Sequence, residues 1–240
     1  MNRKKYKIVL SSLVISSFFV FAFVVENNPA HATSVLRVAE TQVQYSLPQV
    51  SVYDFSSDDS LQRYLSADTP FSDVNYAPAD LVSIDSAFTA NNSKSFQLRQ
   101  ESAIQFADMA WHFRNDFDGD KLWISSAYRS NDFQEYMLKK WCSRAKCALP
   151  WTSEHQWGLA LDLKVIAKGG KWYALSSGNK YYQWFADNAH KRWFHNSYQK
   201  WIDVDGQMVE WRHRRYMGTW LATQLRDKWL TFAEWFKQNN

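Results

Sequence analysis

Apolar and polar residues alternate along residues 159–165, which read LALDLKV. A period of two is typical of a β-strand that buries one face, and leucine or valine occupies every position of that face here. Asp162 lies in the middle of the opposite face, and His155 precedes it by seven residues, with Gly158 between them. The predicted strand therefore carries two polar side chains that packing alone does not explain.

Further helices and strands follow from the hydrophobic periodicity elsewhere in the chain. Ser130 or Asn131 is a suitable N-cap for one of the helices. Helices mixed with a few antiparallel strands indicate an α+β fold, a single compact domain with a small, mainly antiparallel sheet flanked by helices. The periodicity predicts helices over residues 96–115, 131–141 and 181–190, strands over 122–125 and 206–211, and an amphipathic C-terminal helix from about Thr219.

The N-terminus has the three parts of an export signal. Residues 2–7 are basic, residues 8–25 are apolar with scattered serines, and Ala30-His31-Ala32 has the small-x-small form of a signal-peptidase site. We therefore expect residues 1–32 to be a signal peptide and the protein to be exported, whether secreted, periplasmic or cell-wall associated. The apolar run is long for a signal, so an uncleaved membrane anchor is the alternative, and we expect membrane contact only in that case.

The rest of the chain divides into an arm and a domain. Residues 33–75 are rich in Ser, Asp, Val and Gln without sustained periodicity, which predicts a stalk or loosely ordered arm. The folded domain is predicted over residues 76–240. The signal carries a net charge of +3, so only +1 of the formal +4 belongs to the mature chain. That balance gives no case for nucleic-acid binding.

The only two cysteines, Cys142 and Cys147, lie close together in a chain that we expect to be exported. Oxidising compartments favour disulfides, so the spacing predicts a local cross-link that closes a short loop before residues 153–165. A structural zinc site is the alternative. It needs four ligands, and the cysteines supply two.

His155 and Asp162 are candidate zinc ligands. A catalytic zinc takes three protein ligands and leaves a fourth position for water. Among the remaining histidines, only His213 follows a glutamate, Glu210, by three residues. That spacing cannot place both side chains on one face of a regular strand, so the backbone must bulge, turn or coil there. A general base beside a metal ligand needs such a change of direction, because it must reach the activated water without binding the metal.

Three motifs in the chain occur in the order of a known peptidase family. They are Ser126-Ala127-Tyr128-Arg129-Ser130 with Gln134, Ser153-x-His155-x-x-Gly158-x-Ala160-x-Asp162, and Glu210-x-x-His213 followed by Arg215-Tyr216 and Gly218. Together they resemble the VanY-type D-alanyl-D-alanine carboxypeptidases, zinc peptidases related to lysostaphin and to the hedgehog amino-terminal domain. The resemblance covers about residues 76–225 and implies the fold of that family, with the zinc site on the small sheet.

The resemblance implies a role for seven residues. Zinc lowers the pKa of a bound water, a glutamate can accept the proton, and a guanidinium suits a carboxylate or a developing oxyanion. The implied roles are Zn²⁺ ligands for His155, Asp162 and His213, general acid/base for Glu210, a catalytic and substrate-binding cation for Arg129, and secondary substrate contacts for Ser153 and Gln134.

Two classes of function are compatible with these residues. The first is a monomeric zinc carboxypeptidase that removes the terminal D-Ala from a peptidoglycan stem peptide, with an L,D-carboxypeptidase or a cross-bridge endopeptidase as variants. The second is a non-catalytic, hedgehog-like zinc module that binds cell wall or a partner protein. Glu210 favours the enzyme, since a binding module has no need of a base.

Some residues depart from the family pattern. None of the changes removes a ligand, but they crowd the rim of the site and put its substrate preference in question. They are Ala127 in place of Gly, Trp151 where a Gly often stands, Trp157 where a small or polar residue is common, and Trp211-Arg212 in place of Pro-Trp.

The remaining basic residues leave alternatives open. Arg212, Arg214 and Arg215 are either a solvated run of charge or a group that attracts an anionic peptide terminus. The other histidines have no partner pattern, which predicts structural roles for His112, His190 and His195.

Overall fold

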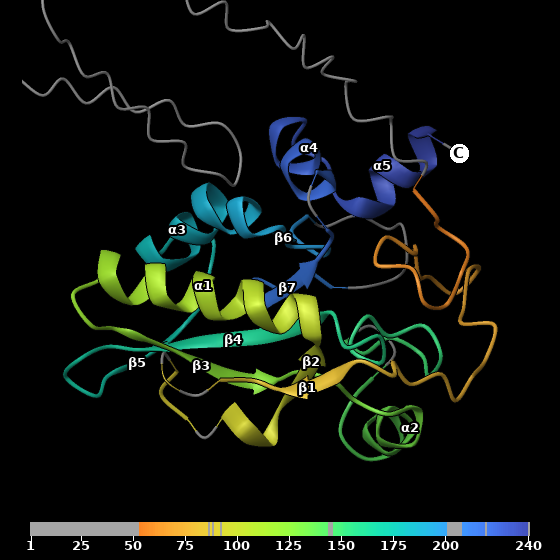
Figure 1. Cartoon of the computed structure of the whole chain (residues 1–240), viewed down its shortest axis with the longest axis horizontal. Helices are drawn as coiled ribbons and strands as arrows, with labels where there is room; N and C mark the ends of the chain where they lie inside the picture. Colours follow the sequence, from red (N-terminus) through yellow and green to blue (C-terminus); the bar gives the residue numbers. More distant parts are fainter. Residues whose placement is uncertain are drawn as a thin grey trace, which may run out of the picture. The chain divides into compact units, whose positions relative to one another are not determined.

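The main sheet is built around strand β4, Ala160–Ile166 (Figure 1). β3 (Lys121–Ser126) pairs along one edge of β4, and β5 (Trp172–Ala174) and β7 (His213–Tyr216) share the other edge, all in antiparallel fashion. β6 (Phe194–His195) extends the sheet beyond β7. The structure, a computed structural model, describes residues 53–85, 87, 89–91, 93–143, 146–200, 208–218 and 220–239.

The register of the sheet aligns polar residues from three strands. Asp162 in β4 is the partner of His213 in β7 and of Ser126 in β3, with a register shift between Ile124 and Ser126. Residues directly opposite one another in an antiparallel pair have neighbouring side chains on one face. The predicted strand over 159–165 and the α+β class are confirmed, and the sheet itself places two candidate ligands side by side.

Helices and a second, two-stranded sheet surround this core. The second sheet pairs β1 (Leu81–Ser83) with β2 (Gln97–Arg99). Among the residues described, none of the helices has the length and apolar character required to cross a membrane. The helices are α1 (Gln100–Asp116), α2 (Asn131–Lys140), α3 (Lys180–Asn188), α4 (Leu221–Asp227) and α5 (Phe232–Asn239), with 3-10 segments η1 (Ser93–Ser95) and η2 (Ala189–Arg192).

Helix α1 supplies one wall of the hydrophobic core and lies along the sheet (Figure 1). Phe106, Met109 and Phe113 are fully buried, and their spacing of three and four residues puts them on one face of the helix. They join one cluster with Leu161 and Leu163, the apolar positions of β4. The periodicity that predicted each element thus corresponds to the face that it buries.

Several element boundaries have local causes. Residues 97–99 pair with β1, so α1 begins at Gln100 rather than at residue 96. Ser130 caps α2, since its side chain accepts a hydrogen bond from the backbone N–H of Phe133 at 3.3 Å. Asn179 caps α3 in the same way through Tyr182 N–H at 2.8 Å. Of the two predicted caps for α2, Ser130 is confirmed.

The C-terminal region corrects two predictions. The strand predicted over 206–211 is misplaced: residues 208–212 form no strand, β7 begins at His213, and residues 206 and 207 lie outside the described part. The single C-terminal helix is two helices, because Trp229 has a φ of 55° between α4 and α5. Thr231 and Glu234 then form a capping box that starts α5, with hydrogen bonds of 3.2 and 2.7 Å.

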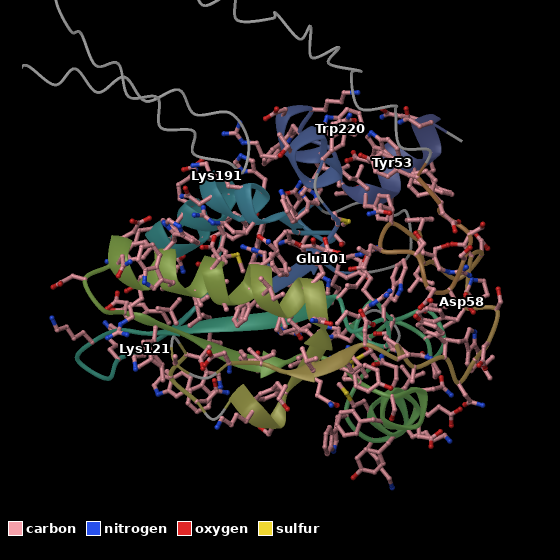
Figure 2. All side chains as sticks on the ribbon, in the orientation of Figure 1. Tyr53, Asp58, Glu101, Lys121, Lys191 and Trp220 are labelled. Atoms are coloured by element: carbon pink, nitrogen blue, oxygen red, sulfur yellow. A yellow bond between two sulfur atoms is a disulfide. The ribbon has the colours of Figure 1, made fainter. Side chains whose placement is uncertain are left out.

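Residues 53–75 pack against the domain, which differs from the predicted arm with a boundary near Tyr76. Leu65 and Phe71 are buried in the main core. Tyr64 belongs to a second cluster with α4 and α5, and the Tyr53 ring stacks on Trp220 at 5.8 Å (Figure 2). These residues belong to the same compact unit as the sheet. The predicted signal at 1–32 and residues 33–52 of the predicted arm lie outside the described residues.

Gly158 joins the loop that carries His155 to β4 and has a φ of +68°. A Cβ there would lie 2.7 Å from Leu81 Cδ2 and 3.3 Å from Arg99 Cγ. We expect Gly158→Ala to lower the free energy of unfolding by about 2–4 kcal/mol, because backbone strain and overpacking add. Urea denaturation measures this change.

Two other glycines serve as matched controls. Gly170 also has a positive φ, +82°, but a Cβ added there would meet no atom within 4 Å, so Gly170→Ala should cost about 1–2 kcal/mol from backbone strain alone. Gly169 has neither constraint, and Gly169→Ala should change stability by less than about 0.5 kcal/mol. Equal losses at Gly158 and Gly170 would show that the contact with Leu81 relaxes freely.

Candidate metal centre and active site

Three predicted ligands converge at one end of the sheet. His155, in the loop before β4, Asp162 in β4 and His213 in β7 offer ligand atoms that all lie within 4.8 Å of one another. Asp162 lies between the two rings: Oδ2 is 3.6 Å from His155 Nε2, and Oδ1 is 3.4 Å from His213 Nδ1. It is the only group of this kind among the residues described.

The second nitrogen of each imidazole is held by the protein. His155 Nδ1 donates to the carbonyl of Ala127 at 2.8 Å, and His213 Nε2 donates to Glu154 Oε2 at 2.8 Å. These bonds leave His155 Nε2 and His213 Nδ1 as the lone-pair nitrogens that face Asp162. Metal-binding histidines use this arrangement, in which a carbonyl or carboxylate fixes the tautomer and the orientation of the ring.

The cluster fits a divalent metal. His213 Nδ1 and Asp162 Oδ1 are buried without a hydrogen-bond partner among the described residues, which is costly unless something else binds them. Burial lowers the pKa of His213, but the Asp162 and Glu154 carboxylates outweigh it and raise that pKa to about 9. The site thus favours a cation at this position. Two imidazoles and one carboxylate are a ligand set suited to zinc.

Glu154 is a functional residue that the sequence analysis missed. Its carboxylate accepts hydrogen bonds from His213, from Ser197 Oγ at 2.8 Å and from Arg215 Nη1 at 2.9 Å. Burial raises the pKa of Glu154, yet the Arg215 charge and the His213 hydrogen bond hold it at about 2, so the residue is ionised at neutral pH. Its place between Ser153 and His155 was the one available signal.

Two of the three arginines that follow Glu210 are buried, so the three form no solvated run of charge. Arg215 stacks over Trp157 at 4.4 Å and binds Glu154, and Arg214 lies over Phe185 at 4.6 Å. The guanidinium groups of Arg214 and Arg215 therefore interact with buried side chains of the protein. Trp157 is also fully buried, which corrects the prediction that it crowds the rim of the site.

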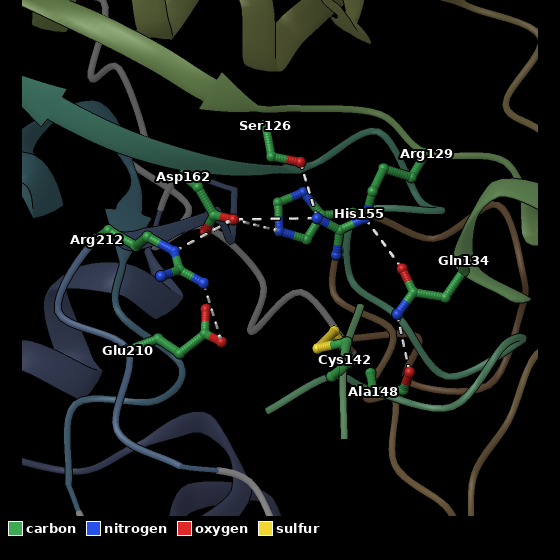
Figure 3. The surroundings of a disulfide bond; sticks show 10 residues. Ser126, Arg129, Gln134, Cys142, Ala148, His155, Asp162, Glu210 and Arg212 are labelled. Atoms are coloured by element: carbon green, nitrogen blue, oxygen red, sulfur yellow. Dashed lines mark hydrogen bonds and ion pairs between the residues drawn. A yellow bond between two sulfur atoms is a disulfide. The ribbon is translucent and has the colours of Figure 1, made fainter. Parts of the chain in front are cut away.

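Arg212 is the member of that group that reaches the site. Its side chain is 51% exposed, and it lies 3.6 Å from Asp162 Oδ2 through Nε and 3.5 Å from Glu210 Oε1 through Nη2 (Figure 3). A guanidinium between two carboxylates and open solvent is able to meet an anionic ligand.

Glu210 stands beside the metal ligands without joining them. A turn closed by a 3.1 Å hydrogen bond from His213 N–H to the Glu210 carbonyl separates the two side chains, as the three-residue spacing required. Burial and the Asp162 charge raise the pKa of the Glu210 carboxyl, while nearby cations oppose the shift. A carboxyl with a raised pKa in a cleft is suited to take up and return a proton.

These groups face one cleft of ≈ 420 Å³. Ser153 is buried at its edge, where its hydroxyl accepts a hydrogen bond from His155 N–H at 3.3 Å. The residues that line the cleft include all three metal ligands, Glu154, Glu210, Arg129, Arg212, Ser153, Tyr198, Phe133, Met137, Trp141 and both cysteines. The predicted Cys142–Cys147 disulfide is confirmed and forms part of the rim (Figure 3).

Arg129 and Gln134 have different positions. Arg129 lies in the cleft, 3.9 Å from Asp162 Oδ2, and donates to Ser126 Oγ at 2.8 Å. Gln134 is fully buried and does not line the cleft. Its amide accepts from Arg129 Nε at 3.0 Å and donates to the Ala148 carbonyl at 2.8 Å. The predicted substrate contact at Gln134 is thus replaced by a contact to Arg129.

The remaining histidines lie away from the metal centre. His190 and His195 line a separate cavity of ≈ 40 Å³. His112 is on α1, 3.7 Å from Asp108. None of the three is part of the ligand cluster.

Comparison with known proteins gives consistent matches. The family model described as VanY: D-alanyl-D-alanine carboxypeptidase matches residues 94–219. The YodJ protein of Bacillus subtilis (strain 168), assigned as a carboxypeptidase, is 31% identical over 184 residues, which are 68% of this chain and 63% of YodJ. The chain therefore spans less than two thirds of that relative.

Solved structures match the fold. A structure of the LdcB LD-carboxypeptidase, described as revealing the basis of peptidoglycan recognition, aligns with a TM-score of 0.64 and 28% identity over 75% of this chain and 87% of LdcB. VanYB in complex with D-alanine-D-alanine aligns at 0.54 and 24% over 74% and 97%. A D,D-pentapeptidase VanY in complex with Zn(II) aligns at 0.53 and 24% over 76% and 99%.

The ligand cluster predicts one zinc ion per chain. We expect His155→Ala, Asp162→Ala and His213→Ala each to abolish tight zinc binding, because two remaining ligands hold a catalytic zinc poorly. Metal analysis of purified protein after dialysis measures the occupancy. His112→Ala is the matched control and should keep full occupancy. Full zinc in His213→Ala protein would remove His213 from the ligand set.

The contact between Glu154 and His213 can be tested by removing the charge of Glu154. We expect Glu154→Gln to weaken zinc binding about 10- to 100-fold, because His213 loses the carboxylate that orients it. The variant should also lose about 3–5 kcal/mol of stability, since Arg215 is left buried without its partner charge. Competition with a chelator below the unfolding temperature gives the zinc affinity. Glu135→Gln, at a partly exposed position on α2, is the control, and an unchanged affinity in Glu154→Gln would contradict the orienting role.

Proposed function

Because the chain belongs to the VanY D-alanyl-D-alanine carboxypeptidase family, we propose that it is a zinc-dependent carboxypeptidase of peptidoglycan stem peptides that hydrolyses the terminal D-Ala-D-Ala bond. The observation that carries the proposal is the meeting of the His155, Asp162 and His213 cluster with Glu210 and Arg129 in one cleft. A metal site, a base and a cation within one cleft are the parts that peptide hydrolysis requires.

His155, Asp162 and His213 would hold Zn²⁺, which supplies a Lewis acid that activates water and polarises the scissile carbonyl. Glu210 accepts the proton of the attacking water and returns it to the amine of the leaving D-Ala. Its raised pKa supports the first step, because a carboxylate with a higher pKa is a stronger base and keeps the proton until the amine leaves. The base must be ionised at the start, so hydrolysis should decline as pH falls through the pKa of Glu210.

Arg129 binds the terminal carboxylate of the substrate. Its Nε and Nη1 are used by Gln134 and Ser126, and Nη2 has no protein partner at hydrogen-bond distance among the described residues. Arg212 adds a second positive charge on the Glu210 side of the cleft. A cleft that carries two guanidinium groups selects peptides with a free carboxyl end, which supports a carboxypeptidase over an endopeptidase.

Glu210 also distinguishes the enzyme from a binding module of the same fold. Its carboxylate lies 3.5 Å from Arg212 in the cleft that holds the ligand cluster. A site that only bound zinc or cell wall would gain nothing from a partly buried carboxyl there, since burying it is unfavourable.

An L,D-carboxypeptidase is the second candidate. The observation that favours it is the likeness to LdcB, which is greater in both TM-score and identity than the likeness to VanYB. The two activities differ in the residue on the amino side of the scissile bond, while both release a carboxyl-terminal D-Ala. The same catalytic groups serve either one.

We also propose that the protein works outside the cytoplasm as a monomer. The basic and apolar residues 1–25 and the Ala30-His31-Ala32 site support export, with cleavage after Ala32 or retention as a membrane anchor. The Cys142–Cys147 disulfide supports the same location, because disulfides persist in oxidising compartments.

The test is release of D-Ala from synthetic stem peptides by zinc-loaded protein. We expect Glu210→Gln to keep zinc and fold while the rate falls by about 10²- to 10⁴-fold, or roughly 3–5 kcal/mol of barrier, because glutamine cannot accept the proton. Glu135→Gln, a substitution of the same kind at a partly exposed position outside the cleft lining, should retain the wild-type rate. Wild-type hydrolysis that survives in Glu210→Gln would refute the mechanism.

The peptide that is cleaved separates the two candidates. Release of one D-Ala from a pentapeptide ending in D-Ala-D-Ala supports the D,D activity, and cleavage of the tetrapeptide alone supports the L,D activity. No release from either peptide by zinc-loaded wild-type protein would favour the binding module. Mass spectrometry of the products gives the bond directly.

A further inference from the structure

The loop after α2 folds back onto the helix that it leaves. Cys142 follows the helix, and the disulfide to Cys147 closes the loop, with hydrogen bonds from Lys146 and Cys147 N–H to the Ser143 carbonyl. The loop then brings the Ala148 carbonyl to the side chain of Gln134 on α2, at 2.8 Å (Figure 3).

The Ala148 carbonyl decides which way the Gln134 amide points. A carbonyl can only accept a hydrogen bond, so it must face the NH₂ group of Gln134. The amide oxygen is then turned toward Arg129, where it accepts from Nε at 3.0 Å. If the amide were reversed, its NH₂ group would face another donor, and this hydrogen bond to Arg129 would be lost.

The guanidinium of Arg129 is held at two points. Gln134 holds Nε, and Ser126 Oγ accepts from Nη1 at 2.8 Å. The side chain is 12% exposed, so it is largely fixed by the protein rather than by water. Of these two hydrogen bonds, the one between Arg129 and Gln134 depends on the loop after α2, because Ala148 orients the Gln134 amide.

The disulfide constrains that loop covalently, in addition to its backbone hydrogen bonds. Trp141, the residue at the end of α2, is 69% exposed and gives little apolar anchorage. Cys147 is buried, so the cross-link ties the exposed end of α2 to a residue in the interior. Closing a short loop covalently reduces the conformations that the backbone can reach. Without the cross-link, the Ala148 carbonyl would sample positions out of reach of Gln134.

We propose that Gln134 and the Cys142–Cys147 disulfide loop are positioning elements for substrate binding, which aim Arg129 at the terminal carboxylate of the peptide. The inference rests on the proposed function, in which Arg129 binds that carboxylate. The loop also lines the cleft through Trp141, Lys146 and Ala148, so it shapes the space that the peptide enters as well as the charge that holds it.

The test compares binding of two peptides that differ only in their carboxyl end. One is an N-acetylated stem peptide ending in D-Ala-D-Ala as the free acid, and the other is its carboxamide. All proteins carry Glu210→Gln and zinc, so that nothing is hydrolysed, and isothermal titration calorimetry gives each Kd. The variants are Gln134→Met and the double variant Cys142→Ser with Cys147→Ser. Lys139→Met, at a position on α2 that is 72% exposed, is the control.

We expect both test variants to bind the free acid about tenfold or more weakly, since a hydrogen bond that orients a charged group is lost. Binding of the carboxamide should weaken much less than binding of the free acid, and zinc content and the control variant should not change. A merely structural role would weaken both peptides together. If the double variant does not fold, the same measurement is made on protein reduced with a phosphine, which becomes the phosphine oxide with the oxygen of one water as the disulfide gains two electrons and two protons.

The inference is overturned if both variants keep the preference for the free acid over the carboxamide. It is also overturned if the protein with Gln134 and the disulfide intact shows no such preference. The first result leaves the proposed hydrolysis untouched, because hydrolysis is measured separately with Glu210 intact. The second would also remove the carboxylate contact proposed for Arg129, but not the hydrolysis itself. Loss of D-Ala release would overturn the proposed function while the peptide preference could still be present.

Discussion

The buried ion pair between Glu154 and Arg215 joins the parts of this molecule that must be in register for the site to form. Arg215 lies in β7 next to Arg214, two residues after His213, while Glu154 immediately precedes His155. The pair, at 2.9 Å, therefore ties the loop that carries one ligand to the strand that carries another. The second terminal nitrogen of Arg215 donates to the Arg63 carbonyl at 2.7 Å, so Arg215 also anchors the segment of residues 53–75.

Such a pair is tolerated because nearly all of its polar atoms have partners; among the described residues, only Nε of Arg215 is buried without one. Taking two charges out of water costs several kcal/mol per ion unless hydrogen bonds compensate. Glu154 accepts from Arg215, His213 and Ser197, and the guanidinium of Arg215 also lies over the rings of Trp157 and Phe232. The network satisfies the carboxylate and at the same time orients His213. Stability of the core and geometry of the metal site thus depend on the same residues.

Charged side chains surround the three candidate metal ligands. Asp162 lies within 4 Å of the His155 and His213 rings and of the Arg129 and Arg212 guanidinium groups, so it balances the two arginine charges. Glu210 meets the same centre from a turn rather than from the strand, which keeps its carboxyl out of the ligand set. The disulfide loop also lines the cleft. The base and both arginine charges thus face one small space, with Arg212 next to Glu210.

Much of the fold could be predicted from the sequence because its elements are local, and most of the candidate site could be predicted because its motifs resemble those of a known family. Strand 159–165, the helices over 100–116, 131–140 and 180–188, the Ser130 cap and the Cys142–Cys147 cross-link each arise from residues close together in the chain. The resemblance to the VanY-type family implied His155, Asp162 and His213 as ligands, and the structure brings these three side chains together.

The tertiary structure alone decided which buried polar groups meet. The partners of Glu154 lie 43 to 61 residues further on, and no spacing in the sequence indicates them. Gln134 turned out to hold Arg129 because Ala148, 14 residues away, fixes its amide. The same cause explains the start of β7, the break between α4 and α5 and the packing of residues 53–75. Short segments take the conformation that satisfies distant partners, whereas periodicity reports only the face that an element buries.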